Sequence, residues 1–227
     1  MKPHEFIKET TEIETTDDKL FSELEKAGYK LIGSGADATV WTKSDSQDVI
    51  KIIMPEDGKD IGHNGHMFYK FYKFCDSHPQ LNNLPVFVDL GAGKQVEVVT
   101  EDDTKYMAIG MEKLNSLNHG SFEEAMVWIL SDLSTKKIPW DLALEEMKNI
   151  ETWELYDGGM DIDKILSKID DLNQSELLEY EILFKLMTLL YHTGNINKFG
   201  WDMHTENVMQ RDDGTLVITD PWFSLSK

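Results

Sequence analysis

Three side chains in the last 30 residues of the sequence carry oxygen atoms at a spacing that could hold a metal-bound phosphate. Asp202 and Asn207 lie five residues apart in the run DMHTEN, and Asp220 ends the short run VITD. Carboxylate and amide oxygens are ligands that Mg²⁺ accepts, and phosphoryl transfer also needs a carboxylate that orients the attacking hydroxyl group. Asp and Asn are frequent in turns as well, so each residue alone is compatible with a structural role. Taken together, the three predict phosphoryl-transfer chemistry.

The run GSGADATVWT, which begins at Gly33, could cover a phosphate with backbone N–H groups. A G-x-G-x-x-A pattern also fits a dinucleotide-binding turn, but that turn must open a helix. Here β-branched and aromatic residues follow, which favour a strand. No Gly-Lys-Ser/Thr follows either, so the run is not a P-loop. We therefore expect a glycine bend between two antiparallel strands, with an ordinary hairpin turn as the alternative.

Lys51 is the only cation in the apolar run DVIKII. On a strand, a lysine between two isoleucines points to the face opposite theirs. It could then reach the phosphates that lie under the glycine bend. A solvent-facing lysine on a half-buried strand is the commoner alternative.

The pattern of apolar residues predicts a β-rich first half and a helical second half. Apolar residues three and four positions apart predict helices, and β-branched runs bounded by turn residues predict strands. Strands are expected within 29–55, as a hairpin joined by KSDSQD, and at 84–92, 105–114 and 215–220. Helices are expected at 19–28, 63–75, 123–133, 140–156, 161–169 and 175–194. The run RDDG before the last strand is a type I′ turn signal.

The predicted fold class is α+β, organised in two lobes. Residues 1–18 are polar and acidic and are expected to form a flexible arm. Residues 19–114 are expected to form a β-rich N-lobe, and residues 115–227 a helical C-lobe that carries the catalytic and metal-binding loops. A short connection is expected near 112–116, and this order of elements would suit a cleft between the lobes.

The composition excludes several classes of protein. The 227 residues carry a net charge of −20 and a single arginine, Arg211, so general binding to nucleic-acid phosphates or anionic membranes is disfavoured. A single cysteine, Cys75, excludes an internal disulfide framework and a multi-cysteine metal site. No apolar run approaches the roughly 20 residues of a membrane span. We expect a soluble protein of a reducing cytoplasm whose acidic surface attracts basic partners.

Four motifs, GSGADATV, VIKI, DMHTEN and the DP after VIT, resemble those of the protein-kinase-like superfamily. The resemblance is closest to the early serine/threonine protein kinases of T7-type bacteriophages, which have a similar DMHxxNxM…ITDP run. The DMH run also looks like the DLH of small-molecule kinases of the aminoglycoside phosphotransferase type. The resemblance implies a two-lobed kinase-like fold with a β-rich N-lobe and a truncated helical C-lobe.

Matched motif by motif, the resemblance implies an enzyme that uses ATP and Mg²⁺. Asp202 would be the catalytic base, and His204 would take the place of a lysine near the γ-phosphate. Asn207 and Asp220 would hold the magnesium ions. The residues expected to bind the nucleotide are Gly33, Gly35, Val40, Lys51, Met111, Glu112 and Leu114, of which the last three lie in a segment, MEKL, that would bind the adenine edge.

The sequence also departs from the kinase pattern. Trp201, not arginine, precedes Asp202, only seven residues follow Asp220, and the helix expected at 63–75 holds no glutamate to pair with Lys51. The leading hypothesis is a phage-type protein serine/threonine kinase that phosphorylates host proteins of basic charge, or itself, in the host cytoplasm during infection. The alternatives are a small-molecule phosphotransferase and a catalytically weak pseudokinase or acidic module that binds and inhibits a host protein.

Overall fold

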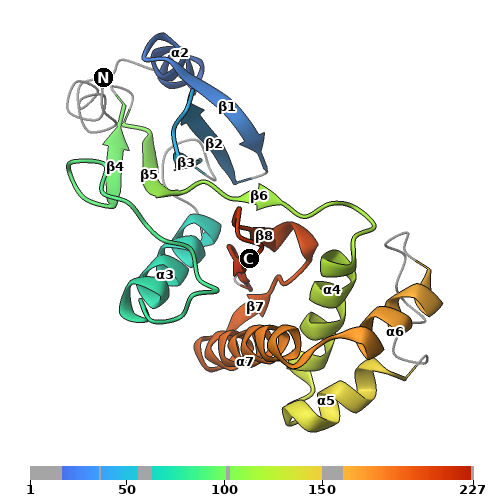
Figure 1. The fold of residues 1–227 in the computed structure, drawn as a ribbon. Helices are drawn as coiled ribbons and strands as arrows, with labels where there is room; N and C mark the ends of the chain where they lie inside the picture. Colours follow the sequence, from blue (N-terminus) through green and yellow to red (C-terminus); the bar gives the residue numbers. More distant parts are fainter. Residues whose placement is uncertain (1–16, 36, 56–62, 101–102, 150–160, 226–227) are drawn as a thin grey trace. The chain divides into compact units, whose positions relative to one another are not determined.

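The structure, a computed structural model, describes residues 17–35, 37–55, 63–100, 103–149 and 161–225. Most of the arm predicted at 1–18 therefore lies outside the described residues. The chain divides into two compact units (Figure 1). The first consists mainly of residues up to 81 and 85–113, and the second of 82–84 and 114–225.

A five-stranded antiparallel sheet forms the centre of the first unit, in the order β1-β2-β3-β5-β4. Its strands are β1 (Tyr29–Ser34), β2 (Ala38–Lys43), β3 (Asp48–Ile53), β4 (Gln95–Val99) and β5 (Lys105–Glu112). The hairpin predicted around KSDSQD is confirmed as β2 and β3. The glycine bend lies between β1 and β2, which pair antiparallel as expected.

The strand predicted at 84–92 is wrong. In that stretch only Phe87 forms a bridge, an isolated one to Met111, while β4 lies further along the chain. Pro85 has no N–H to donate to a ladder. Strand β4 ends at Val99 and β5 begins at Lys105, and Asp103 between them adopts a φ of 63°. Closing a short loop costs little entropy, so these neighbours in the sequence pair with each other.

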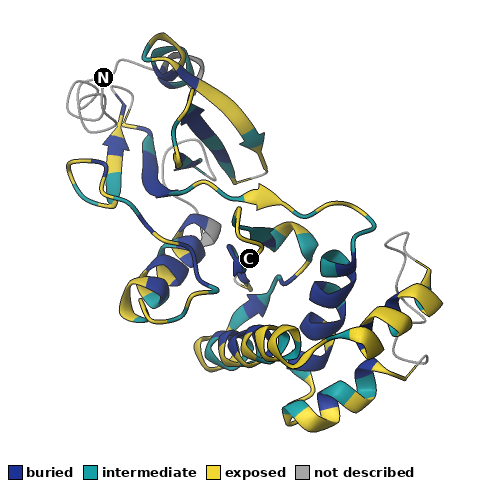
Figure 2. Ribbon diagram, viewed as in Figure 1, coloured by how far each residue is buried: buried dark blue, intermediate teal, exposed yellow. Residues whose placement is uncertain are grey.

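The two faces of the sheet have different neighbours. Helix α2 (Asp17–Lys26) packs Leu20 and Leu24 against one face, where they join a buried cluster with Trp41, Ile50 and Ile52 (Figure 2). Side chains alternate between faces along a strand. Val40, which is next to Trp41, and Lys51, which lies between Ile50 and Ile52, therefore belong to the other face. Helix α3 (His63–Ser77) contacts that face through the Phe68 ring, over which the Lys51 ammonium lies.

The second unit is mainly helical, as predicted, with two small antiparallel sheets. Its helices are α4 (Phe122–Thr135), α5 (Trp140–Met147), α6 (Ile162–Asp171) and α7 (Gln174–Asn197). The sheets are β10-β7 and β6-β8-β9, formed by β6 (Asn115–Ser116), β7 (Phe199–Trp201), β8 (Val208–Gln210), β9 (Leu216–Ile218) and β10 (Trp222–Ser224). A single 3₁₀ turn, η2 (Thr205–Asn207), precedes β8.

Helix α7 is the longest described helix and has a defined start and end. A capping box closes its first turn, in which the Asn173 side chain accepts from the Glu176 backbone and the Glu176 side chain accepts from the Asn173 backbone. At its other end Lys198 adopts the left-handed conformation with a φ of 60°, which stops the helix and turns the chain into β7.

The turn between β8 and β9 is not the predicted type I′ turn. The Gly214 N–H bonds to the Arg211 carbonyl group, and Gly214 alone in this loop has a positive φ, of 92°. A type I′ turn needs a positive φ at both central residues, which are Asp212 and Asp213 here. The loop is instead a type I turn followed by a left-handed glycine, the commoner solution for a longer hairpin loop.

The segment Asn82–Leu84 is joined to the second unit by hydrogen bonds. The guanidinium group of Arg211 donates to the carbonyl groups of both terminal residues of this segment. The Asn83 side chain donates to the Leu216 carbonyl group at 2.7 Å, and the Asn83 carbonyl group accepts from the Ile218 N–H at 2.9 Å. The only arginine of the sequence therefore holds a distant piece of the chain against the β8–β9 hairpin.

The predicted α+β class is confirmed, with an antiparallel sheet in the N-terminal part and helices in the C-terminal part. None of the helices in the described part of the chain combines the length and apolar character needed to cross a lipid bilayer.

We expect Gly110→Ala to destabilise the first unit. A Cβ at Gly110 would lie 2.6 Å from the carbonyl oxygen of Val88 and 2.7 Å from Cδ2 of Leu90. Relief of this overlap needs a backbone shift, for which we expect a cost of about 1–3 kcal/mol in the free energy of unfolding. Urea denaturation measures it, with Gly35→Ala as the control because its nearest contact is 3.9 Å away. An unchanged midpoint for Gly110→Ala would contradict the packing described.

Candidate functional site

Two backbone hydrogen bonds bring the loop DMHTEN and Asp220 together in the second unit. The Asp202 N–H donates to the carbonyl group of Pro221 at 2.9 Å, where β7 pairs with β10. The Thr219 N–H donates to the carbonyl group of Asn207 at 2.9 Å, where β8 pairs with β9. Asp220 lies between these two anchored residues. The strands thus place the three predicted oxygen-bearing residues beside one another.

The Asn207 side chain organises the loop from within. Its Nδ2 donates to the Asp202 carbonyl group at 2.5 Å and lies 3.3 Å from the Asp202 Oδ2 atom. It also lies 3.0 Å from the His204 Nε2 atom, and His204 Nε2 is 3.7 Å from Asp202 Oδ1. A carbonyl group can only accept, so the amide nitrogen faces the loop. The amide oxygen is then the atom with which Asn207 can bind a cation.

Buried contacts from two helices support this loop. The Ser131 hydroxyl group on α4, itself buried, donates to the carbonyl group of Met203 at 2.8 Å. Trp222, which follows Asp220 by two residues, is buried and donates from its indole nitrogen to the Leu190 carbonyl group of α7 at 3.0 Å. A Cβ at Gly194 would lie 3.0 Å from that indole nitrogen, so the ring packs closely against the helix backbone at this glycine. The loop therefore rests on a fixed helical base.

The donor set fits a hard divalent cation. Asp202 and Asp220 offer carboxylate oxygens and Asn207 an amide oxygen, and all three are partly exposed. The described residues hold no group of three or more His, Cys, Asp and Glu side chains arranged for a metal. Mg²⁺ does not need such a cage, because it is commonly bound by one or two carboxylates together with water and substrate phosphates.

In the first unit, predicted nucleotide-binding residues lie in one row across three strands. Gly33 of β1 pairs with Val40 of β2, and Val40 pairs with Lys51 of β3. The bend ahead of this row is closed by a hydrogen bond of 2.9 Å from the Gly35 N–H to the Ala38 carbonyl group. Directly paired residues share a face of the sheet, so Val40 and Lys51 lie side by side on it.

Lys51 has a buried aromatic neighbour on helix α3. Its Nζ lies 3.6 Å from the centre of the Phe68 ring, within the range of a cation–π interaction. Phe68 is buried and makes edge contacts with Phe71 and Phe87, at centroid distances of 6.2 and 6.5 Å. The ring is therefore held in place by other rings, and it fixes the position of the ammonium group.

The three residues of the predicted adenine-binding segment have different surroundings. Met111 is buried in β5 and pairs with Val49, on the same sheet face as Lys51. The Glu112 N–H donates to the carbonyl group of Val86 at 2.8 Å, and its carboxylate accepts from the Val86 N–H at 2.7 Å. Leu114 already belongs to the second unit.

The structure thus brings the predicted residues together in two groups. The second unit gathers Asp202, His204, Asn207 and Asp220, and the first gathers Gly33, Val40, Lys51 and Met111. Two supporting residues escaped the sequence analysis, namely Ser131 and Phe68. The signal for Ser131 was a serine within an otherwise apolar helical face. For Phe68, in a helix with aromatic residues around its circumference, no sequence signal singled it out.

Neither a protein-family model nor a curated protein matches the sequence. Among solved structures, a spectinomycin phosphotransferase in complex with ADP and spectinomycin is similar, with 11% sequence identity and a TM-score of 0.37. The match covers 90% of this chain and 68% of that one. At this identity and TM-score, the likeness carries neither the family nor the activity of that enzyme to this chain.

We expect Ser131→Ala to cost about 1–3 kcal/mol in the free energy of unfolding, because the buried Met203 carbonyl group loses its donor. Thr135→Ala on the same helix is the matched control, because Thr135 is partly exposed and bonds only to a carbonyl group of its own helix. Its effect should stay within about 0.5 kcal/mol. Chemical denaturation of both variants compares them, and equal effects would contradict a supporting role for Ser131.

Proposed function

We propose that this chain is an ATP- and Mg²⁺-dependent protein serine/threonine kinase of the T7-type phage class, which phosphorylates host proteins or itself. The observation that carries the proposal is the convergence of Asp202, Asn207 and Asp220 at one point of the second unit, through the hydrogen bonds of Asp202 and Thr219. Such an oxygen donor set beside a carboxylate is what phosphoryl transfer requires.

The roles follow from the chemistry of each group. The Asp202 carboxylate would accept or orient the proton of the substrate hydroxyl group as its oxygen attacks the γ-phosphorus. The bond between the γ-phosphorus and the β–γ bridging oxygen breaks, and ADP leaves with that oxygen. Asn207 and Asp220 would hold Mg²⁺, which neutralises charge on the triphosphate. His204, beside Asp202 and Asn207, would donate to the γ-phosphate.

The first unit would hold the nucleotide. Lys51 would bind the α- and β-phosphates, and the backbone of Gly33 and Gly35 would lie over the triphosphate. Met111 would contact the adenine from the sheet face that it shares with Lys51. Phe68 supports the role of Lys51, because a buried ring holds an ammonium group in place as a glutamate would, at a distance of 3.6 Å.

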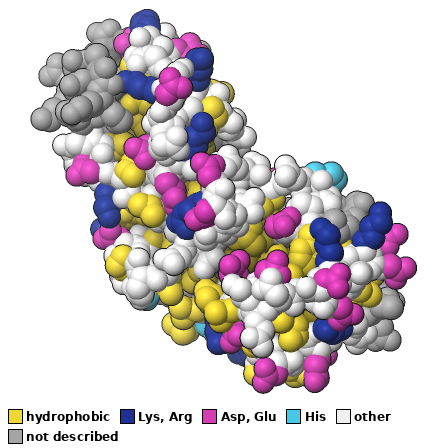
Figure 3. All heavy atoms as spheres, viewed as in Figure 1, with side chains coloured by type: hydrophobic (Ala, Val, Ile, Leu, Met, Phe, Trp, Pro, Cys, Tyr) yellow, Lys and Arg dark blue, Asp and Glu magenta, His cyan; other side chains and the backbone are white. Residues whose placement is uncertain are grey.

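The net charge of −20 supports basic proteins as substrates. Acidic side chains are spread over the face of the molecule shown in Figure 3. An acidic surface raises the rate at which basic partners are encountered, and it repels nucleic acids and anionic membranes. We propose the cytoplasm of the infected host as the compartment in which these partners are met.

A small-molecule phosphotransferase is the second candidate, favoured by one observation. The run Asp202-Met-His204 resembles the DLH run of aminoglycoside-type kinases, and in it the His204 Nε2 atom lies 3.7 Å from the Asp202 Oδ1 atom. The reaction and its residues would be the same, and only the hydroxyl group that attacks would come from a different molecule.

We expect Asp202→Asn and Asp220→Asn each to lower phosphate transfer from ATP by roughly 10²–10⁴-fold, because they remove the proton-accepting and the metal-binding carboxylate. Transfer of radiolabelled phosphate to a histone mixture, and to the protein itself, measures this. Asp132→Asn is the control, since Asp132 is exposed and forms a surface ion pair with Lys136. It should retain full transfer.

The same assay, run also with a panel of aminoglycosides and sugars as acceptors, separates the three candidates. Label in protein that disappears in both variants supports the kinase. Label found only in aminoglycosides or sugars supports the small-molecule phosphotransferase. Equal label in the wild type and in both variants contradicts phosphotransfer by this site and leaves the non-catalytic acidic module.

We expect Phe68→Leu to raise the KM for ATP about threefold or more with little change in kcat, because Lys51 loses the ring beneath its ammonium group. Phe74→Leu is the control, because it removes the same ring volume from a partly buried position of the same helix, where the ring stacks on His78. Steady-state kinetics at varied ATP distinguishes them. An equal rise in KM for both would indicate a general packing defect.

A further inference from the structure

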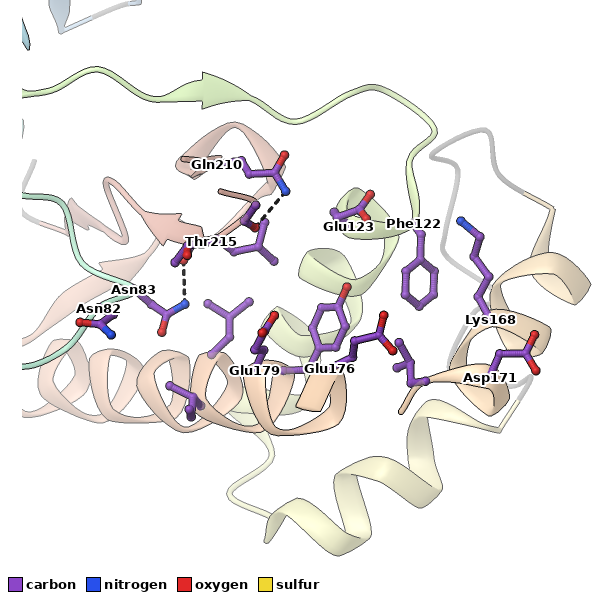
Figure 4. Close-up of a pocket in the computed structure, with 16 residues that line it drawn as sticks. Asn82, Asn83, Phe122, Glu123, Lys168, Asp171, Glu176, Glu179, Gln210 and Thr215 are labelled. Atoms are coloured by element: carbon purple, nitrogen blue, oxygen red, sulfur yellow. Dashed lines mark hydrogen bonds between the residues drawn. The ribbon is translucent and has the colours of Figure 1, made fainter. Parts of the chain in front are cut away.

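The second unit contains a pocket that includes none of the residues expected to carry out phosphotransfer. Its volume is about 630 Å³, within the range of ligand-binding cavities. It lies between α4, α6, α7 and the β8–β9 hairpin, with Asn82 and Asn83 on one side (Figure 4). Phe122, Tyr180 and Leu183 give it an apolar floor, and the Phe122 and Tyr180 rings meet edge to face at 6.1 Å.

The charged groups around this floor are mainly acidic. Lys168 is the only cation among the lining residues, against the four carboxylates of Glu123, Asp171, Glu176 and Glu179. Burial raises the pKa of the Tyr180 phenol, and the negative charges of Glu123, Glu176 and Glu179 raise it further. Three carboxylates from two helices therefore act on one point inside the pocket, where they create a negative potential.

The wall of the pocket already holds an ammonium group that belongs to the chain itself. The Lys168 Nζ lies 5.2 Å from the centre of the Phe122 ring, in a cation–π contact. Lys168 comes from α6 and Phe122 from α4, so this contact is made across the pocket and not along one helix. It shows which chemistry the wall accepts, namely an alkylammonium group above an aromatic ring.

Exposed apolar side chains continue from the pocket along α7. Leu178 is 54% exposed and Ile182 is 45% exposed, and Ile182 also lines the pocket. The two residues are four positions apart and share one face of the helix. A free cation would leave this apolar face in water, whereas a peptide with large apolar side chains next to its basic ones would cover it.

We propose that this pocket and the adjoining face of α7 dock a basic segment of a protein, in which Lys or Arg residues lie next to large apolar residues. The cationic groups would pair with Glu123 and Glu179 and displace Lys168 from Phe122, and the apolar side chains would pack on Leu178 and Ile182. The assignment of this pocket as a substrate-docking site rests on the proposed kinase function, whereas the binding of a basic segment does not depend on it.

Fluorescence anisotropy tests the site with a labelled peptide of three lysines, a glycine and two leucines separated by a serine. We expect Glu123→Gln/Glu179→Gln to bind it at least tenfold more weakly than the wild type. The control Asp132→Asn/Glu145→Gln removes the same charge from exposed positions outside the pocket, and its affinity should stay within twofold. Replacing both leucines by glycine should weaken binding to the wild type at least threefold.

Lys168→Gln gives a second test, in the opposite direction. Removing the ammonium group that occupies the pocket wall should tighten peptide binding, and a folding defect cannot produce such a gain. Unchanged affinity in both Lys168→Gln and Glu123→Gln/Glu179→Gln overturns the proposal, and so does an equal loss in the control. The proposal is also overturned, in favour of general polycation binding, if spermine or the peptide with both leucines replaced by glycine binds as tightly as the original peptide.

The assay is independent of the phosphotransfer assignment. It contains neither ATP nor metal, and Asp202→Asn should bind the peptide as the wild type does. Peptide binding without any phosphate transfer would refute the kinase while the docking site stands. Transfer that is lost in Asp202→Asn, together with absent peptide binding, would refute the docking site while the kinase stands.

Discussion

The candidate site of the second unit depends on two backbone hydrogen bonds, from Asp202 to Pro221 and from Thr219 to Asn207. Neither bond involves a functional side chain, yet together they fix where Asp220 lies relative to the loop DMHTEN. Holding a loop in one conformation costs conformational entropy, so an arrangement of this kind must be stabilised from elsewhere. Here the backbone pairing of β7 with β10 and of β8 with β9 supplies that stabilisation, and the buried anchors Ser131 and Trp222 add to it.

In the first unit, aromatic packing supports the charged side chain of Lys51. Lys51 is partly buried on the sheet face that α3 contacts, and a charge that loses part of its water needs a favourable contact. The Phe68 ring supplies one, and the rings of Phe71 and Phe87 hold it in place. The opposite face of the same sheet packs on the core under α2. Because side chains alternate along β3, Ile50 and Ile52 join that core while Lys51 lies on the other face.

Much of the fold could be predicted from the sequence, because it follows from local periodicity. The helices α4, α6 and α7 and the β2–β3 hairpin lie where the apolar spacing and turn residues put them. Strand β4 was missed because the run at 84–92 is the more apolar one, whereas pairing was decided by the short connection to β5. The oxygen-bearing residues were predictable from their types and spacing. Ser131 and Phe68 were not, because their roles depend on contacts between segments far apart in the sequence.

The hydrogen bonds of Asn82–Leu84 to the β8–β9 hairpin have a consequence for how the protein is made. Asn83 and Leu216 are 133 positions apart, so a ribosome must add most of the second unit before this piece of the first half finds its partners. Until then the segment must stay available while its flanking residues fold. Separate expression of the chain before and after residue 113 would give two incomplete polypeptides, because the C-terminal one would lack Asn82–Leu84, which belong to the second unit.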